Sequence, residues 1–264
     1  MTGYRYPSEQ GILFLTLLLI GTVLAFSAVP TLCLAPLLAL GFIFLVYQLN
    51  QTQYRKVLRG GTKVTAQQTP RLAALVASCA QRLKPSPVEV FVLPERVLNA
   101  YTFGFSNPKV IVVYSPMLEV MDAEELAFVI GHEMGHVALG HSWLNTLLGG
   151  IAGVPTGLAG AVALTLAFRW WNRACEYSAD RAGLLACGSL SKAVSALAQL
   201  AVGDIRSQIE LQQALALLEK QDDAVGSVLQ EALATHPMII KRIHELQQWA
   251  GTAEYRRLAA QIKI

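Results

Sequence analysis

The residues with the clearest chemical meaning form the pentad His-Glu-Met-Gly-His at positions 132–136. Two histidines four residues apart lie on one face of a helix, so both imidazoles can reach a single metal ion. Zinc accepts neutral imidazole nitrogens in a tetrahedral shell, and a catalytic zinc site leaves one position open to water. Glu133 directly follows the first histidine, where its carboxylate can take a proton from that water. The pentad therefore predicts one catalytic Zn²⁺ per chain, with His132 and His136 as ligands and Glu133 as general base.

The sequence around the pentad predicts a buried helix. Asp122 is a good N-cap, and Glu125 three residues later completes the pattern of a capping box. The residues that follow are almost all apolar: Leu126, Ala127, Val129, Ile130, Met134, Val137 and Ala138. A helix that is apolar on nearly every side is buried, and uncoordinated polar side chains inside it would cost several kcal/mol. Metal binding is therefore favoured over the alternative that three polar residues merely share an exposed face.

A third protein ligand is expected from a second predicted helix at 172–183, which carries Glu176 and Asp180 four residues apart. Glu176 can complete a shell of two histidines and one glutamate, as in thermolysin-type sites. Asp180, one turn later, can accept the free N–H of a ligand histidine. The alternative is a solvated helix face, on which Arg173 and Arg181 would offset the repulsion between the two carboxylates.

Together these motifs resemble the membrane-associated gluzincin metallopeptidases of the HtpX and type 1 CAAX prenyl protease family. In that family His-Glu-x-x-His is followed by Glu-x-x-Ala-Asp, which matches residues 176–180. Asn99-Ala100-Tyr101 is similar to the family's Asn-Ala-Phe motif, and Thr235-His236-Pro237 with Arg242 is similar to its late Thr-His-Pro-x-x-x-x-Arg segment. The resemblance covers roughly residues 69–248 and keeps the family's order of motifs.

The resemblance implies roles that the residues alone do not. It implies that Asn99, Ala100 and Tyr101 belong to an edge strand that binds the substrate backbone by strand addition. It also implies that His236 reaches the active site, either as a donor to the oxyanion or as a cap on the resting zinc ion. On residue types alone, Asn99 and Tyr101 would be ordinary strand and turn residues, and His236 would be an ordinary surface histidine. The run Thr102-Phe103-Gly104-Phe105 departs from the small, glycine-rich run usual there, which leaves the shape of the substrate groove open.

Composition indicates a membrane protein and argues against a nucleic-acid-binding protein. Hydrophobic residues make up 53% of the chain and charged residues 15%, against about 25% charged in ordinary soluble domains. The net charge of +3 is small and scattered, so it does not indicate binding to nucleic acid. The 4 cysteines show no paired spacing, so neither a disulfide framework nor a cysteine-ligated zinc site is expected.

Residues 11–50 predict a transmembrane hairpin of two helices, because no charged residue occurs between Gly11 and Tyr47. Each arm, divided near Pro30, could cross a bilayer core of about 30 Å. A cleaved signal peptide is less consistent, since Arg5 is the only preceding basic residue and a second apolar arm follows at once. Four basic residues after the second arm place both termini, and with them the catalytic domain, in the cytoplasm: Arg55, Lys56, Arg59 and Lys63.

The predicted fold is α+β and mostly α-helical, with the transmembrane hairpin followed by a zincin-type metallopeptidase domain. The expected organisation is a tail at 1–10, the hairpin, a linker at 51–66, the peptidase domain at 67–250 and a C-terminal helix at 251–264. Three short strands at 88–93, 97–103 and 110–114 should form a small antiparallel sheet beside the zinc helix. Residues 143–171 are expected to form an apolar helical hairpin at the membrane surface, with one long helix in the soluble core as the alternative. His141 and His244 are expected to be bystanders.

The expected function is that of a zinc-dependent endopeptidase, an integral protein of the plasma or inner membrane. Polypeptides are the expected substrates, and the resemblance together with the bilayer suggests membrane or membrane-proximal proteins in quality control. Two alternatives stay open: a catalytically silent zinc-binding membrane scaffold, and a protease that processes itself into a soluble form.

Overall fold

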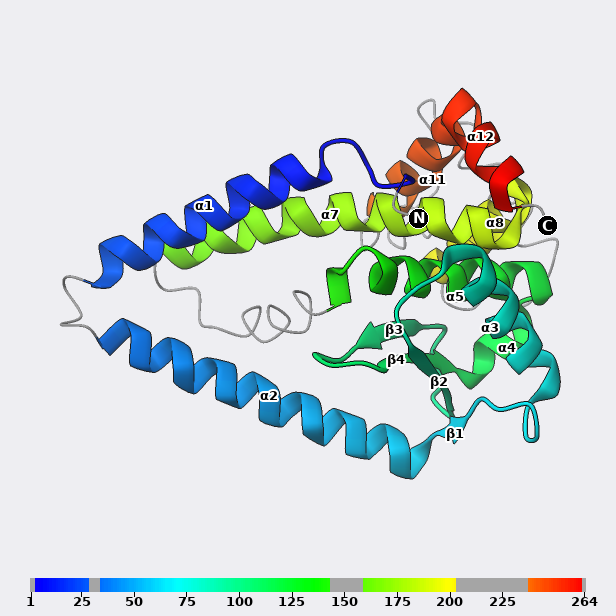
Figure 1. Cartoon of the computed structure of the whole chain (residues 1–264), viewed down its shortest axis with the longest axis horizontal. Coiled ribbons are helices and arrows are strands. Elements are labelled where there is room, and N and C mark those ends of the chain that lie inside the picture. The colour runs from blue at the N-terminus through cyan, green and yellow to red at the C-terminus, as the bar shows by residue number, and fades with distance from the viewer. Residues whose placement is uncertain (1–2, 29–33, 143–158, 203–236, 263–264) are drawn as a thin grey trace.

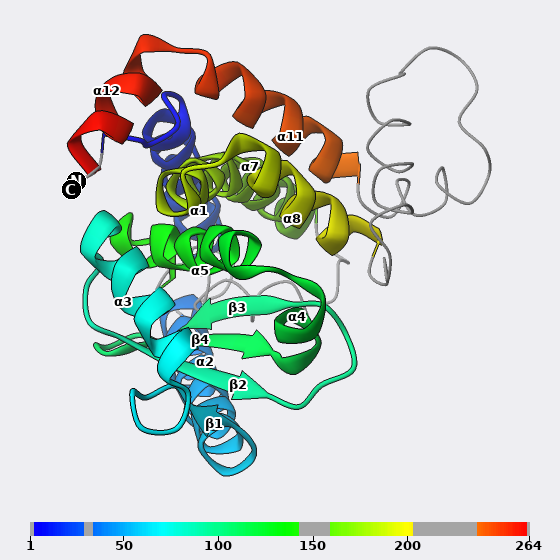
Figure 2. The same ribbon diagram turned by 90° about the vertical axis from the view of Figure 1, so that its right-hand side faces the viewer.

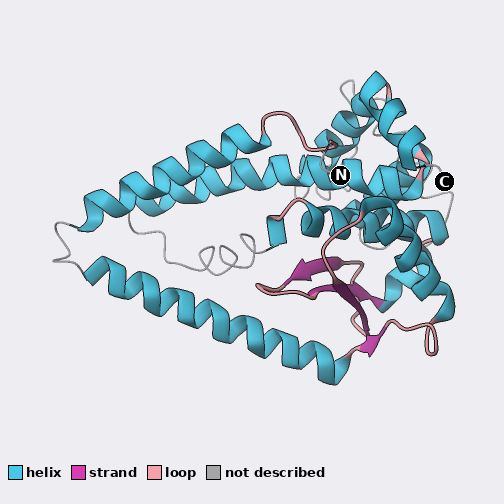
Figure 3. Cartoon of the chain, in the orientation of Figure 1, coloured by secondary structure: helices cyan, strands magenta, loops and turns pink. Residues whose placement is uncertain are grey.

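The computed structural model describes residues 3–28, 34–142, 159–202 and 237–262 (Figure 1). The fold of this part is mostly helical with a small mixed sheet of four strands, as Figure 3 shows. The predicted α+β class is therefore confirmed. In chain order the elements are α1 (Glu9–Ala28), α2 (Leu34–Gly60), β1 (Thr62–Lys63), α3 (Pro70–Leu83), β2 (Val88–Leu93), β3 (Ala100–Phe103), β4 (Lys109–Tyr114), α4 (Ser115–Val120), α5 (Ala123–Ala138), α7 (Ala159–Cys187), α8 (Leu190–Val202), α11 (Pro237–Ala250) and α12 (Ala253–Ile262).

The sheet is mixed, so the prediction of an antiparallel sheet is wrong. Its strand order is β1-β2-β4-β3, and β2 pairs with β4 in parallel, with Val90 opposite Ile111. β3 pairs with β4 antiparallel, and β1 pairs with β2 antiparallel. The chain passes from β2 to β3 before it returns as β4 between them, so β4 runs in the direction of β2. Three consecutive strand patterns with short turns do not show that the third strand lies between the first two in the sheet.

Both faces of the sheet are buried. Ile111 and Val113 of β4 belong to the main core with α3 and α5, while Val110 and Val112 face a second cluster that includes Val57 of α2. Burial on both faces explains why β4 is an uninterrupted apolar run rather than an alternating one. β3 occupies the edge of the sheet nearest α5 (Figure 2).

The buried helix predicted after Asp122 is confirmed as α5, and its N-terminus has the predicted capping box. The Asp122 carboxylate accepts hydrogen bonds from the backbone N–H groups of Glu124 and Glu125, each at 3.0 Å. The Glu125 carboxylate accepts in return from the Asp122 N–H at 2.9 Å, and from Ser195 of α8 at 2.6 Å. These bonds define where α5 begins and join it to α8.

Helices α5 and α7 pack at very short range through small residues. A Cβ atom added at Gly131 would lie 2.3 Å from the Cβ of Ala186, and one at Gly135 would lie 2.6 Å from the Cβ of Ala182. A Cβ added at Gly183 of α7 would lie 2.7 Å from the carbonyl oxygen of Phe128. Only glycine permits this separation, which sets how far apart the two motif-bearing helices lie.

The N-terminal helices are longer than the predicted arms. α1 begins at Glu9 and packs along α7, whereas α2 continues to Gly60 on the other side of the molecule (Figure 1). No helix in the described ranges is both long and apolar enough to cross a membrane. The predicted turn near Pro30 lies outside the described residues. Residues 143–158 of the predicted apolar hairpin are also outside them, and residues 159–171 form the start of α7.

We expect Gly131→Ala to destabilise the protein by about 1–3 kcal/mol, the usual cost of overpacking a filled interior. Thermal unfolding of the detergent-solubilised chain measures the effect. In an Ala186→Gly background the same substitution should cost clearly less, because the 2.3 Å contact is gone. Gly41→Ala in α2 is the control, since a Cβ there meets nothing within 4 Å. Equal effects at Gly131 and Gly41 would contradict the close packing of α5 on α7.

Candidate metal site

The structure brings His132 and His136 of α5 together with Glu176 of α7. The two Nε2 atoms lie 3.2 Å apart, and the Glu176 carboxylate lies 3.5 Å from His132 Nε2 and 3.4 Å from His136 Nε2. Bonds of about 2.0–2.1 Å to zinc imply ligand–ligand separations of about 3.3 Å in a tetrahedron. The three separations match that edge length, so these side chains fit a zinc ion. Two imidazole nitrogens that face each other at this distance are arranged for a shared cation rather than for a bond to each other.

Arg242 of α11 compensates the charge of the two carboxylates on α7. Its guanidinium donates to Asp180 through Nε at 2.8 Å and Nη2 at 2.6 Å, and its Nη1 lies 3.0 Å from Glu176. Asp180 in turn lies 3.0 Å from His132 Nδ1. Asp180 thus lies within hydrogen-bond distance of one of the two predicted ligand histidines, as the sequence led us to expect.

The electrostatic balance keeps both carboxylates ionised. Burial by itself raises the pKa of Glu176 and of Asp180, but Arg242 and the histidines outweigh burial. As a result, the pKa of Glu176 lies well below its usual value and that of Asp180 is also lowered. An ionised carboxylate is the form that binds a metal ion.

Two arginines that could have offset the carboxylates lie elsewhere. Arg173 is exposed and donates to the carbonyl of Arg169 at 3.3 Å. The guanidinium carbon of Arg181 lies 5.2 Å from the ring centre of Tyr6 and 5.0 Å from that of Trp249. Arg242 was noted in the sequence only through the late family motif, and its pairing with α7 depends on packing that spacing does not reveal.

Thr102 of β3 contacts the expected general base and was missed by the sequence analysis. Its hydroxyl donates to Glu133 Oε2 at 2.6 Å. Side chains alternate along a strand, so Tyr101 points to the opposite face, where its ring centre lies 5.9 Å from those of Phe103 and Tyr114. Of the residues predicted to bind substrate, Ala100 lies in β3, Asn99 is exposed just before it, and the Tyr101 side chain points away from the metal ligands.

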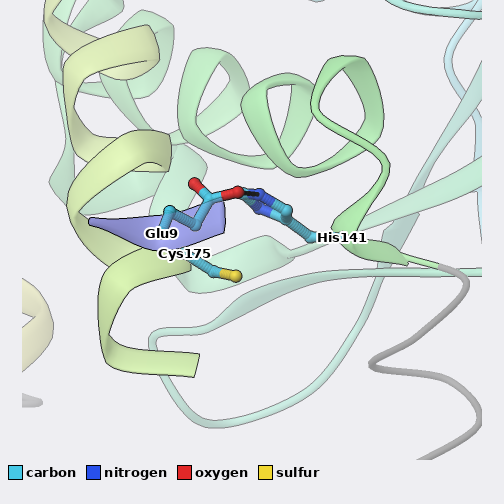
Figure 4. A group of neighbouring side chains, drawn as sticks. All are labelled: Glu9, His141 and Cys175. Carbon is cyan, nitrogen blue, oxygen red and sulfur yellow. Dashed lines mark hydrogen bonds and ion pairs between the residues drawn. The ribbon is translucent and has the colours of Figure 1, made fainter. Parts of the chain in front are cut away.

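The prediction that His141 is a bystander is wrong. Its Nδ1 lies 3.0 Å from His136 Nδ1, and its Nε2 lies 3.0 Å from the carboxylate of Glu9. Figure 4 shows Glu9 and His141 pointing toward each other, with Cys175 beside them. Helical spacing does not reveal this contact, because α5 ends at Ala138 and the positive φ of Gly140 (79°) turns the chain back. His244 is exposed and pairs with Gln248 at 2.8 Å, away from these groups. His236 lies outside the described residues.

A helix with two histidines and a glutamate, a second helix with a further candidate ligand and a mixed sheet beside them are the arrangement expected of a metallopeptidase. Residues 66–250 match the model of peptidase family M48. The chain belongs to this family, and the predicted resemblance to metallopeptidases of the HtpX group is confirmed.

Three relatives illustrate the similarity. The chain is 31% identical over 210 residues to the plastoglobule-localized metallopeptidase 48 of Arabidopsis thaliana, an alignment that covers 74% of this chain and 61% of the plant protein. It is 28% identical over 232 residues to protease HtpX of Acinetobacter baylyi, covering 71% of this chain and 76% of that protein. It is 27% identical over 212 residues to a protease HtpX homolog of Syntrophotalea carbinolica, covering 67% and 75%. The chain thus spans about three fifths of the plant relative's length.

We expect Arg242→Met to lower the free energy of unfolding of the chelator-treated protein by about 3–5 kcal/mol, the usual cost of removing one partner from a buried ion pair. The loss arises because the buried Asp180 and the partly buried Glu176 would have no arginine beside them. Chemical unfolding in detergent measures it, with Arg257→Met on the exposed face of α12 as the control. If both variants unfold like the wild type, Arg242 does not carry the charge balance of the site.

Proposed function

We propose that this chain is a membrane-anchored, zinc-dependent endopeptidase, with His132, His136 and Glu176 as zinc ligands. The observation that carries the proposal is the spacing of the three ligand atoms, whose separations equal the edges of a zinc tetrahedron. Membership of a metallopeptidase family supports the same reaction class. Hydrolysis of peptide bonds by activated water follows from this donor set combined with a carboxylate base.

When bound, a zinc ion supplies Lewis acidity, which makes a water proton easier to remove and a peptide carbonyl easier to attack. Glu133 takes the proton from the attacking water and delivers it to the nitrogen of the departing amine. Thr102 donates to Oε2 of Glu133, which leaves Oε1 for the water. Asp180 accepts the Nδ1 proton of His132 and so keeps its Nε2 available as a ligand.

Substrate would bind as an added strand along β3. Tyr114 N–H donates to the carbonyl of Asn99 at 3.0 Å, so by alternation the backbone groups of Ala100 and Thr102 point away from β4. No other described strand pairs with that edge. A peptide hydrogen-bonded to Ala100 and Thr102 would pass beside Glu133, the contact partner of Thr102. Asn99 and Tyr101 flank these positions and would contribute to the same groove.

His236 is proposed as a further active-site residue, either as a donor to the oxyanion or as a cap on the resting zinc ion. It precedes α11, the helix whose Arg242 contacts both Glu176 and Asp180. The start of a helix tied to the metal ligands in this way is a suitable location for a side chain that acts on the substrate.

Membrane anchoring is supported by an apolar surface on α1 and α2. Its large side chains are roughly half or more exposed: Phe14, Leu15, Leu17 and Leu18 on α1, and Ile43, Phe44, Leu45 and Leu49 on α2. Runs of exposed large apolar side chains on two successive helices exceed the isolated apolar residues of soluble proteins and suit a lipid environment. Exposed Arg55, Lys56 and Arg59 follow it on α2, which favours a cytoplasmic side for the catalytic part.

A site close to a bilayer would act on membrane or membrane-proximal polypeptides, and quality control of damaged membrane proteins is the corresponding role. The alternative is a catalytically silent scaffold that binds zinc and partners. The intact Glu133 and its hydrogen bond from Thr102 favour catalysis, since a scaffold has no need of a positioned base.

Glu133→Gln should keep one zinc ion per chain and lose at least about a hundredfold in turnover of unfolded casein, because the side chain is a base and not a ligand. His132→Ala, His136→Ala and Glu176→Ala should lose both zinc and activity. Exposed Glu119→Gln is the matched control and should behave like the wild type. Chelator should abolish wild-type turnover. A zinc-loaded wild type with no turnover would favour the scaffold, and a Glu133→Gln rate above about a tenth would show that the base is misassigned.

The proposed topology predicts which positions of a cysteine-free chain can be labelled in intact cells. A cysteine introduced at Pro30 should react with a membrane-impermeant reagent added from outside. One introduced at Gly60 should react only after permeabilisation, because the exposed basic residues near it stay in the cytoplasm. Labelling of Gly60→Cys in intact cells would reverse the orientation without affecting the assigned chemistry.

A further inference from the structure

We propose that Glu9, at the start of α1, is a positioning residue for the zinc ligand His136 and acts through His141. The inference rests on the proposed function, since it assigns a role toward the zinc ion. In this role, Glu9 makes the N-terminal segment a component of the metal site and not only a membrane anchor.

Glu9 is fully buried although it lies at the first position of its helix. Its carboxylate contacts His141 Nε2 at 3.0 Å and also accepts hydrogen bonds from Ser178 of α7 and from Arg5. The backbone N–H of Tyr6 donates to Ser178 Oγ at 2.8 Å, so the chain before α1 is held at the same place. A buried carboxylate with three donors from separate parts of the chain is positioned rather than incidental.

The proton positions follow from the role of His136 as a ligand. Its Nε2 must present a lone pair to the metal, so its proton resides on Nδ1 and is donated to His141 Nδ1 at 3.0 Å. His141 then carries its proton on Nε2 and donates it to Glu9. In the hydrogen-bonded series from His136 through His141 to Glu9, each donor therefore faces one acceptor. The Glu9 carboxylate, which only accepts, determines the tautomer of both imidazoles.

Burial supports this assignment of protons. The His141 ring is 1% exposed, so both of its nitrogens need a protein partner, and a neutral imidazole can accept at one nitrogen while it donates at the other. Burial alone would raise the pKa of Glu9, but His141, Ser178 and Arg5 together lower it. An ionised carboxylate facing a neutral imidazole is the arrangement that orients metal-binding histidines.

The two ligand histidines are therefore supported in different ways. His132 meets a carboxylate directly, since Asp180 lies 3.0 Å from its Nδ1. His136 reaches a carboxylate only through His141, and that carboxylate comes from a position 132 residues earlier than His141. Displacement of α1 would leave the His136 ring without its fixed orientation, while the His132 ring would keep its own.

The neighbouring Cys175 raises a competing possibility, because ligand atoms of Glu9, His141 and Cys175 lie within 4.8 Å of one another (Figure 4). A second metal ion held by these three would need the Nε2 lone pair of His141. In the proton arrangement above, that nitrogen carries a proton directed at Glu9.

The test measures zinc affinity by chelator competition on the full-length chain in detergent. Glu9→Ala should weaken zinc binding about 10- to 100-fold, as loss of a partner that orients a ligand histidine typically does. His141→Phe, which keeps a ring in place, should cause a similar loss. Glu9→Ala/His141→Phe should lose no more than the larger single effect, because both residues act in one series. Glu9→Gln keeps the acceptor without its charge and should fall between Glu9→Ala and the wild type.

Cobalt substitution supplies a readout that a purely structural role would not change. The visible absorption of bound Co²⁺ reports the orientation of its ligands, so Glu9→Gln and His141→Phe should alter the spectrum in folded protein. Exposed Glu119→Gln and buried Cys175→Ala should keep wild-type zinc affinity and spectrum. Wild-type affinity and spectrum in Glu9→Gln and His141→Phe, with thermal unfolding showing both folded, would overturn the proposal.

Metal stoichiometry separates the remaining outcomes. One zinc ion per wild-type chain, retained in Cys175→Ala, agrees with the positioning role. Two metal ions in the wild type and one in Cys175→Ala would replace it with a second metal site. A wild type that binds no zinc would instead refute the proposed function, so the two failures are distinguishable.

Discussion

The short separation of α5 and α7 is the constraint on which the metal site depends. Gly131 and Gly135 lie against the surface formed by Ala182 and Ala186, where a single methyl group would force the helices apart. The proposed ligands of α5, His132 and His136, are next to these glycines in the sequence, and Glu176 lies on the facing helix. Metal–ligand distances tolerate about 0.2 Å, so a helix separation fixed by backbone contact serves the chemistry better than one set by flexible side chains. The same glycines that weaken helix propensity therefore provide the precision of the site.

Charge balance is the second requirement, because α7 presents two carboxylates four residues apart to a buried region. Arg242 reaches both from α11, and its pKa is raised above its usual value since Asp180 and Glu176 outweigh its burial. A bound zinc ion would add positive charge on the other side of Glu176. The candidate site thus draws on separate parts of the chain: α5, α7, α11, β3 and the segment that begins α1. Each part contributes a side chain that pairs with a side chain from another part.

The sequence predicted what depends on neighbouring residues and missed what depends on distant ones. The capping box at Asp122 and the strand at 88–93 follow from local spacing, and both are confirmed. The parallel pairing of β2 with β4 and the contact of Arg242 with α7 depend on how segments meet in space. His141 shows the difference most clearly, because it was expected to be a bystander while Gly140 turns the chain back toward His136. The residues around Glu9 did not indicate its contact with His141, since a single acidic residue before an apolar helix is usually a polar flanking residue.

Helix α1 combines two environments on opposite faces. Glu9, Ile12 and Thr16 recur at helical spacing and are buried, while Phe14, Leu15, Leu17 and Leu18 are exposed. The buried face contacts the helix that carries Glu176, with Ile12 packed beside Trp171 and Cys175. If the exposed face lies in a bilayer, as proposed, the membrane and the metal site act on the same rigid element. A displacement of α1 would then move Glu9 away from His141 and leave the His136 ring without the support that this contact provides.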